Sequence, residues 1–168
     1  MELKLRKAEL NDFKSVFDVY TLAIQVMKDM GIDQWDEIYP GEDIIIKDIK
    51  NQHMYIGEID NQIASIVVLN NEYDEEYKEA DWKYKDSSFL IVHRLCVNPS
   101  FQGKGIGRQT MLLVEKKLSQ EGIETIRLDA FSLNPVALKM YNSLGYEKVG
   151  EVTWRKGLFY LFEKRICS

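Results

Sequence analysis

The sequence predicts an α/β (α+β) protein built on one mixed, mostly antiparallel sheet of about seven strands, with helices on both faces. This prediction rests on two observations. Segments typical of strands are interleaved with segments of helical period, in the order β-α-α-β-β-β-α-β-α-β-β. The chain has 168 residues, of which 45% are hydrophobic and 29% charged, so its size and composition indicate one globular domain over residues 1–168.

The first half of the chain predicts a strand, two helices and a hairpin. Leu3 and Leu5 alternate with charged residues, which is typical of a half-buried strand, and helical spacing follows. Asp60-Asn61 is a favourable pair for a hairpin turn. The predicted elements are a strand over 2–8, a helix from Asn11 to Gly31, a short helix over 42–51, and hairpin strands over 53–59 and 63–69.

The second half predicts four strands and two helices around a glycine-rich turn. Asn134-Pro135 predicts a helix start, with Asn as the cap and Pro at the first helical position, and Gly145 predicts its end. The predicted elements are strands over 89–97, 125–130, 146–153 and 158–165, and helices over 108–120 and 134–145.

Two connections leave alternatives open. Residues 32–41 contain Trp35 and Tyr39 beside acidic residues, so these rings either line a functional site or cap the core. Residues 71–86 are acidic and rich in tyrosine without a clear period. They predict a solvated loop, with a gate over a binding site as the alternative.

Composition excludes several classes. The formal net charge of −5 argues against a nucleic acid partner, because such binding needs concentrated Lys and Arg. No apolar run approaches the ~20 residues of a membrane span, and the first seven residues lack the apolar core of a secretory signal. Of the two cysteines, Cys96 and Cys167, the first lies in an apolar strand. A disulfide framework is therefore not expected, and the sequence predicts a cytoplasmic protein without a membrane partner.

An apolar strand, a glycine-rich turn and a helix follow one another over residues 89–120. Gly103, Gly105 and Gly107 leave the backbone amides of the turn open, and Lys104 and Arg108 add positive charge. Backbone amides at a helix start, next to cations, are suited to a diphosphate. The alternative is an ordinary loop in which the glycines serve only for turning.

Two well-known glycine motifs do not fit this turn. A P-loop needs Gly-x-x-x-x-Gly-Lys-Ser/Thr, which is absent from the sequence. A dinucleotide fold would use an acidic residue about 20 positions beyond the glycines, where Asp129 lies. However, the spacing of the glycines differs from Gly-x-Gly-x-x-Gly, and no further βαβ unit follows.

A third motif matches better. Gln102-x-x-Gly105-x-Gly107 resembles the Arg/Gln-x-x-Gly-x-Gly/Ala signature of the GCN5-related N-acetyltransferase (GNAT) superfamily. The hexapeptide alone is moderately specific.

A second signature follows 27 residues past Gly107. The segment Asn134-x-x-Ala137-x-x-x-Tyr141-x-x-x-Gly145-Tyr146 is similar to the Asn-x-x-Ala-x-x-x-Tyr-x-x-x-Gly-Phe of the same superfamily, with Tyr in place of the final Phe. Because both motifs occur in order, and the predicted element order is also that of the superfamily, the chain is identified as a member over its whole length.

The resemblance implies where acetyl-CoA, the cosubstrate, would bind. In such enzymes the fourth and fifth strands splay apart near a bulge, and the pantetheine arm pairs with the fourth strand like an extra strand. The resemblance implies no metal ion. The implied cofactor-binding residues are Leu95, Cys96 and Val97 through their backbone, Gln102, Gly103, Lys104, Gly105, Ile106, Gly107 and Arg108 around the pyrophosphate, and Asn134 on the cofactor arm.

The resemblance also implies catalytic residues for direct attack of an amine on the thioester. Tyr141 matches the tyrosine that donates a proton to the leaving thiolate, with packing of its ring as the alternative. Asp129 lies where the ribosomal-protein alanine acetyltransferases carry a glutamate, and His93 lies where the arylalkylamine acetyltransferases carry a histidine. Either residue, or an ordered water chain, would serve as the base. Cys96 is not expected to act as a nucleophile, because no His and carboxylate accompany it.

The implied function is transfer of an acetyl group from acetyl-CoA to a primary amine of a small molecule or of a peptide or protein N-terminus, by a monomer or homodimer. A non-catalytic CoA-binding module is the main alternative, and a nicotinamide enzyme is a third. The acceptor is not readable from the sequence, and acyl groups other than acetyl stay open.

Overall fold

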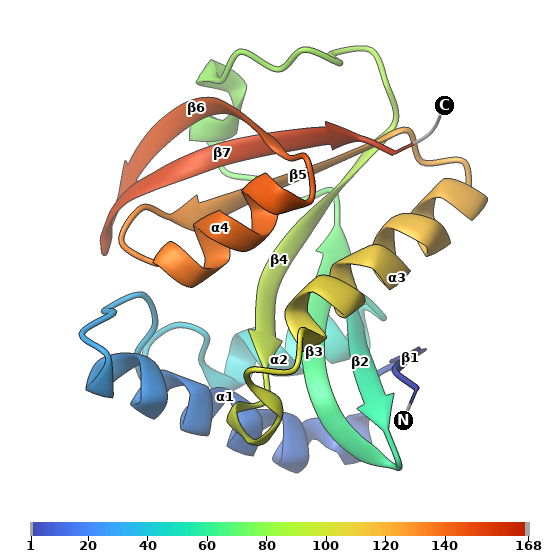
Figure 1. Ribbon diagram of the computed structural model, residues 1–168, viewed down its shortest axis with the longest axis vertical. Coiled ribbons are helices and arrows are strands. Elements are labelled where there is room, and N and C mark those ends of the chain that lie inside the picture. The colour runs from blue at the N-terminus through green and yellow to red at the C-terminus, as the bar shows by residue number, and fades with distance from the viewer. Residues whose placement is uncertain (1, 167–168) are drawn as a thin grey trace. The chain divides into compact units, whose positions relative to one another are not determined.

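The computed structural model describes residues 2–166 and has the predicted fold class (Figure 1). The elements are β1 (Lys4–Lys7), η1 (Leu10–Asp12), α1 (Phe13–Asp29), α2 (Glu42–Lys50), β2 (Met54–Ile59), β3 (Gln62–Asn70), η2 (Glu75–Glu79), β4 (Phe89–Val97), η3 (Pro99–Phe101), α3 (Ile106–Gln120), β5 (Thr125–Phe131), α4 (Pro135–Ser143), β6 (Glu147–Trp154) and β7 (Gly157–Arg165).

The strands form one mixed sheet in the order β1-β2-β3-β4-β5-β7-β6. The pairs β1/β2, β2/β3, β5/β7 and β6/β7 are antiparallel, and β4/β5 is parallel. The parallel register ends at Val92 and Leu128, whereas β4 continues to Val97. This ending agrees with the predicted divergence of the fourth and fifth strands.

The chain divides into two compact units, which are described separately. The first comprises Met1–Leu69 and Arg94–Leu113, and the second comprises Asn70–His93 and Val114–Ser168. The strand β4 and the helix α3 each contribute residues to both units.

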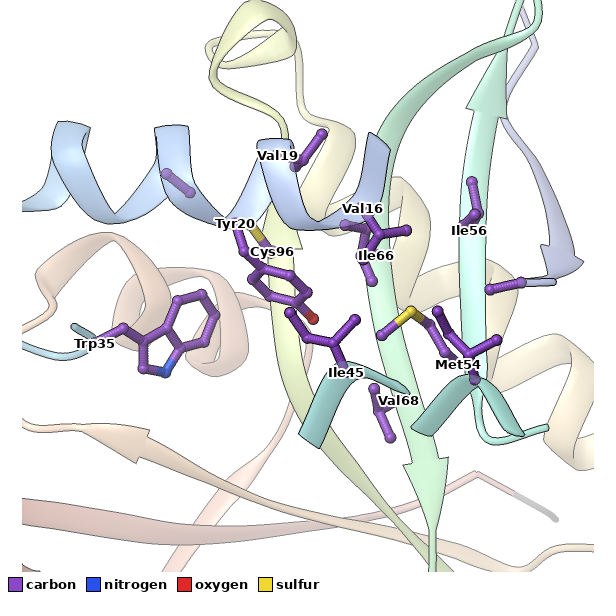
Figure 2. Close-up of a cluster of buried hydrophobic side chains, with 13 residues drawn as sticks. Val16, Val19, Tyr20, Trp35, Ile45, Met54, Ile56, Ile66, Val68 and Cys96 are labelled. Carbon is purple, nitrogen blue, oxygen red and sulfur yellow. The ribbon is translucent and has the colours of Figure 1, made fainter. Parts of the chain in front are cut away.

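The core of the first unit lies between α1, α2 and the hairpin β2/β3 (Figure 2). The ring of Trp35 is buried, with an edge-on contact to Tyr20 at 5.6 Å between centroids, so Trp35 belongs to the core. The buried members labelled in Figure 2 are Val16, Val19, Tyr20, Trp35, Ile45, Met54, Ile56, Ile66, Val68 and Cys96.

The hairpin turn has the geometry that its sequence predicts. Asp60 and Asn61 both adopt positive φ, at 49° and 64°. This left-handed pair matches the twist of antiparallel strands, and Asn and Asp tolerate it better than most residues. The two-residue loop between β2 and β3 is therefore confirmed.

The segment over 71–86 differs from the solvated loop that its composition predicts. Much of it is exposed, but Tyr77 and Trp82 are buried in a cluster with residues of β4, β6 and β7. The backbone N–H of Asp81 also donates to the carbonyl of Val149, at 2.9 Å. The sequence pattern did not indicate this packing, because the buried aromatic residues follow no strand or helix period.

Gly150 of β6 allows this segment to approach the sheet closely. A Cβ atom at Gly150 would lie 2.9 Å from the Cβ of Ala80. Gly150→Ala is therefore expected to lower the free energy of unfolding by about 1–3 kcal/mol through overpacking, although alanine is the better residue for a strand interior. Urea denaturation measures this loss. Thr153→Val, on the exposed face of the same strand, is the matched control, and an equal change in both variants would contradict the packing argument.

Candidate active site

The glycine turn belongs to the first unit and is built by the end of β4, η3 and the start of α3. Asn98 fixes the turn: its Oδ1 accepts from the N–H of Ser100 at 3.0 Å, and its Nδ2 donates to the carbonyl of Ile63 at 2.7 Å. The N–H of Gln102 donates to the carbonyl of Pro99 at 3.3 Å, so this amide already has a partner.

Two glycines of the turn adopt a backbone conformation that L-residues rarely adopt. The φ angles of Gly103 and Gly105 are 78° and 71°. A Cβ at Gly103 would meet no atom within 4 Å, and one at Gly105 would come only to 3.9 Å from the Gln109 side chain. These glycines are therefore needed for positive φ, and their Cα atoms border open space that a ligand could enter.

The helix α3 begins at Ile106, two residues before the predicted start at Arg108. The carbonyl of Gly105 accepts the N–H of Gln109 at 3.0 Å. The amides of Ile106 and Gly107 lie in the first turn, where N–H groups have no partner within the helix. With the exposed side chains of Lys104 and Arg108, this helix start has the chemistry of an anion site.

Arg94 shapes β4 just before Leu95–Val97, the residues whose backbone is implied to bind the cofactor. Its φ is +51°, which is unusual for a residue other than glycine. Its carbonyl accepts the hydroxyl of Tyr20 at 2.8 Å, and its guanidinium donates to both oxygens of Asp48 at 2.8 and 2.9 Å and to the Tyr39 hydroxyl at 2.8 Å. Tyr39 thus makes a polar contact with β4. The backbone of Leu95–Val97 follows a residue with positive φ, which is held by Tyr20 of α1 and Asp48 of α2.

Cys96 is buried, and burial raises the pKa of its thiol to about 12. A thiol with this pKa stays protonated near neutral pH, which agrees with the expectation that Cys96 is not a nucleophile.

The raised pKa predicts slow alkylation of Cys96. In a Cys167→Ser variant, iodoacetamide is expected to modify the folded protein at pH 7.5 far more slowly than the urea-unfolded protein, because reaction needs thiolate and access. The rate should increase with pH well beyond pH 9, since the native thiol loses its proton only near 12. Mass spectrometry measures both rates, and equal rates in the folded and unfolded protein would contradict burial.

Asp129 and His93 belong to the second unit. The β4/β5 register ends at Val92 and Leu128, so His93 and Asp129 occupy the next position along each strand. Side chains alternate between the two faces of a sheet, which places both residues on the face of Arg127. Both side chains are half-buried.

Asp129 has a partner that the sequence did not indicate. The hydroxyl of Tyr77 donates to Oδ2 of Asp129 at 2.5 Å. The two residues are 52 positions apart, and no motif links them. The only sequence signal is the concentration of aromatic residues within 71–86.

Tyr141 lies on α4, which packs on the other face of β5 and β7 (Figure 1). Its ring is buried, at 5.7 Å from Tyr146 and 6.3 Å from Phe162 between centroids. Burial, and then the charge of Asp129, raise the pKa of its hydroxyl above the usual value of 10. The hydroxyl is therefore protonated at neutral pH and able to donate, while the ring packs as well.

Asn134 caps α4 as predicted. Its Oδ1 accepts the N–H of Ala137 at 3.2 Å, and Pro135 occupies the first helical position. This role is compatible with the implied contact to the cofactor arm, which stays a prediction.

The predicted site residues thus fall into two sets. Residues 95–97 and 102–108 belong to the first unit, and His93, Asp129, Asn134 and Tyr141 belong to the second. Within residues 2–166, no group of three or more His, Cys, Asp or Glu side chains is placed to hold a metal ion. The helices in that range are too short or too polar to cross a membrane.

Comparison with known proteins defines the class. The model of the acetyltransferase (GNAT) family matches residues 19–146, which include both signatures and parts of both units. The chain belongs to the GNAT acetyltransferase family.

Individual relatives agree with this assignment. The uncharacterized N-acetyltransferase YesJ of Bacillus subtilis is 27% identical over 166 residues, covering 96% of this chain and 89% of YesJ. The [ribosomal protein bS18]-alanine N-acetyltransferase of Haemophilus ducreyi is 31% identical over 105 residues, covering 55% of this chain and 68% of that protein. A GNAT acetyltransferase of Streptococcus agalactiae has the same fold, with a TM-score of 0.86 and 23% identity over 97% of this chain and 95% of that one.

Proposed function

We propose that this protein transfers an acetyl group from acetyl-CoA to a primary amine of a small molecule or of a peptide or protein N-terminus. The observation that carries this proposal is Tyr141, whose ring is buried and whose hydroxyl has its pKa raised by burial and then by the charge of Asp129, in a chain of the GNAT family. The relationship to an alanine N-acetyltransferase supports an N-terminal amine as one acceptor class.

The glycine turn fits the diphosphate of acetyl-CoA. The conformations of Gly103 and Gly105 and the first amides of α3 support an anion site from Gly103 to Arg108, with the amide of Gln102 already paired. Lys104 and Arg108 would neutralise charge there. The backbone of Leu95–Val97 would receive the pantetheine arm.

The proposed chemistry assigns two proton transfers. When bound, acetyl-CoA supplies the thioester carbonyl that the amine attacks. Asp129 accepts the proton that the amine loses as its bond to carbon forms, directly or through a water, and Tyr141 donates a proton to the sulfur as the carbon–sulfur bond breaks. His93 is the alternative base, since it occupies the equivalent position on β4.

The first experiment is a calorimetric titration with acetyl-CoA, CoA and NAD in parallel. The proposal expects binding of both CoA compounds and none of NAD, followed by CoA release in a thiol assay with a panel of small amines and peptides. Binding of NAD alone would overturn the proposal. Binding of CoA without turnover of any amine in the panel would favour the alternative, a non-catalytic CoA-binding module.

Asp129→Asn and His93→Gln then separate the two candidate bases. If Asp129 is the base, Asp129→Asn lowers kcat by about 10²–10⁴ and His93→Gln does not. The single domain over 1–168, the cytoplasmic location and the monomeric or homodimeric state stay predictions beside this proposal.

A further inference from the structure

Tyr77 makes a contact that no signature of the family assigns to it. We propose that Tyr77 is a positioning residue, which fixes the carboxylate of Asp129 and stabilises its ionised form so that it can accept the proton of the amine. This inference rests on the proposed role of Asp129 as the base.

The geometry of the contact is that of a strong hydrogen bond. The Tyr77 hydroxyl donates to Oδ2 of Asp129 at 2.5 Å, which lies in the 2.5–2.7 Å range of a hydroxyl bound to a carboxylate. A donor to an ionised carboxyl group favours the ionised form over the protonated one. Because the Asp129 side chain is only half-buried, a donor on one oxygen restricts its rotation without closing it off.

The ring of Tyr77 is held on several sides. It is buried, with Trp82 at 5.6 Å and Trp154 at 6.3 Å between centroids, and the Trp154 ring is stacked on it at 20°. The indole N–H of Trp82 also donates to the backbone carbonyl of Tyr77 at 2.6 Å. The hydroxyl is therefore presented from a fixed ring.

The segment that carries Tyr77 is itself anchored to the sheet of the second unit. The backbone N–H of Lys83 donates to Glu163 of β7, and the Asp81 N–H donates to β6. The guanidinium of Arg127 lies over the rings of Trp82 and Phe89, at 4.3 and 3.9 Å from their centroids. These contacts fix the backbone that follows Tyr77 in the chain.

Other titratable groups surround Asp129 on the elements packed against it. Tyr141 on α4 senses its charge, and His93 occupies the neighbouring position on β4. Arg127 and Glu163 lie two pairs further along the β5/β7 register, on the same face. The Tyr77 hydroxyl is the group that donates the hydrogen bond described above to the Asp129 carboxylate.

The first test needs no acceptor. In protein labelled with ¹³C-aspartate, the carboxyl signal of Asp129 is identified by its loss in Asp129→Asn and followed against pH. Tyr77→Phe is expected to move its midpoint to higher pH by about one unit, because the ionised form loses a donor. Tyr73→Phe is the matched control: this half-exposed ring stacks on Tyr77 at 6.1 Å, and the midpoint should stay where it is.

The second test asks whether Tyr77 acts through Asp129. With an amine found in the thiol-release panel, Tyr77→Phe is expected to lower kcat roughly tenfold with the KM for acetyl-CoA unchanged, and to have no further effect in the Asp129→Asn background. Thermal unfolding of Tyr77→Phe checks that the segment stays packed.

Each outcome decides between the two proposals. An unmoved midpoint in Tyr77→Phe, or an equal loss of kcat with and without Asp129, overturns the positioning role and leaves the proposed acetyl transfer intact. Normal turnover by Asp129→Asn would instead remove Asp129 as the base. In that case a shifted midpoint would still report the hydrogen bond but no role in the reaction.

Discussion

Tyr141→Phe is expected to lower kcat for acetyl transfer by about 10²–10⁴, the usual contribution of a positioned acid. The substitution keeps the ring that packs against Tyr146 and Phe162 and removes only the hydroxyl. Burial and the charge of Asp129 keep the pKa of that hydroxyl above its usual value, so the proton is present throughout the neutral range. The loss of rate should therefore be similar at every pH from 6 to 9.

The measurement is thiol release, together with calorimetric binding of acetyl-CoA, which should be unchanged. Tyr146→Phe is the matched control. Its hydroxyl donates to Glu115 at 2.9 Å, and the family signature has Phe at this place, so this variant should turn over at close to the normal rate. Normal turnover by Tyr141→Phe would remove the general acid from the mechanism.

Asp48→Ala is expected to lower the free energy of unfolding by about 3–5 kcal/mol. The Asp48 carboxylate and the Arg94 guanidinium form a two-bond pair whose side chains are only 6% and 11% exposed. Removal of the carboxylate leaves a buried cation with only the Tyr39 hydroxyl among the partners described above. Few single changes outside the apolar core should cost as much.

Chemical denaturation measures this loss, and the exposed pair Lys14–Asp18 provides the control. There the side chains are 89% and 66% exposed, so Asp18→Ala should cost at most about 1 kcal/mol. A similar small loss for Asp48→Ala would show that Arg94 finds water or another acceptor once the carboxylate is removed. The KM for acetyl-CoA should also rise in Asp48→Ala, because Arg94 directly precedes Leu95–Val97, the part of β4 that is implied to bind the cofactor.

Local patterns predicted most of the fold, and long-range contacts account for what they missed. The turn at Asp60-Asn61 and the cap at Asn134 are specified by neighbouring residues, so the sequence alone located them. The residues around Arg94 do not predict its positive φ. Its side chain is held instead by a long-range contact with Asp48, 46 positions away.

The candidate site was predictable to the same extent. Two short signatures predicted the residues of the turn and Tyr141 as candidates, and the family match includes both signatures. The bond from Tyr77 to Asp129 joins a segment without periodicity to a strand 52 positions later, and only tertiary packing creates it. Composition instead predicted a solvated loop there, because it weighs the acids and not the buried rings.

The three tryptophans of the chain are divided between the two units, which provides separate optical probes. Trp35 lies in the core of the first unit, and Trp82 and Trp154 pack around Tyr77 in the second. Fluorescence of Trp35→Phe therefore reports unfolding of the second unit, and that of the double variant Trp82→Phe/Trp154→Phe reports the first. We expect the fluorescence unfolding curve of each variant to coincide with the circular dichroism unfolding curve of the same variant, because β4 and α3 supply residues to both units. Coincident transitions are the signature of a single cooperative domain.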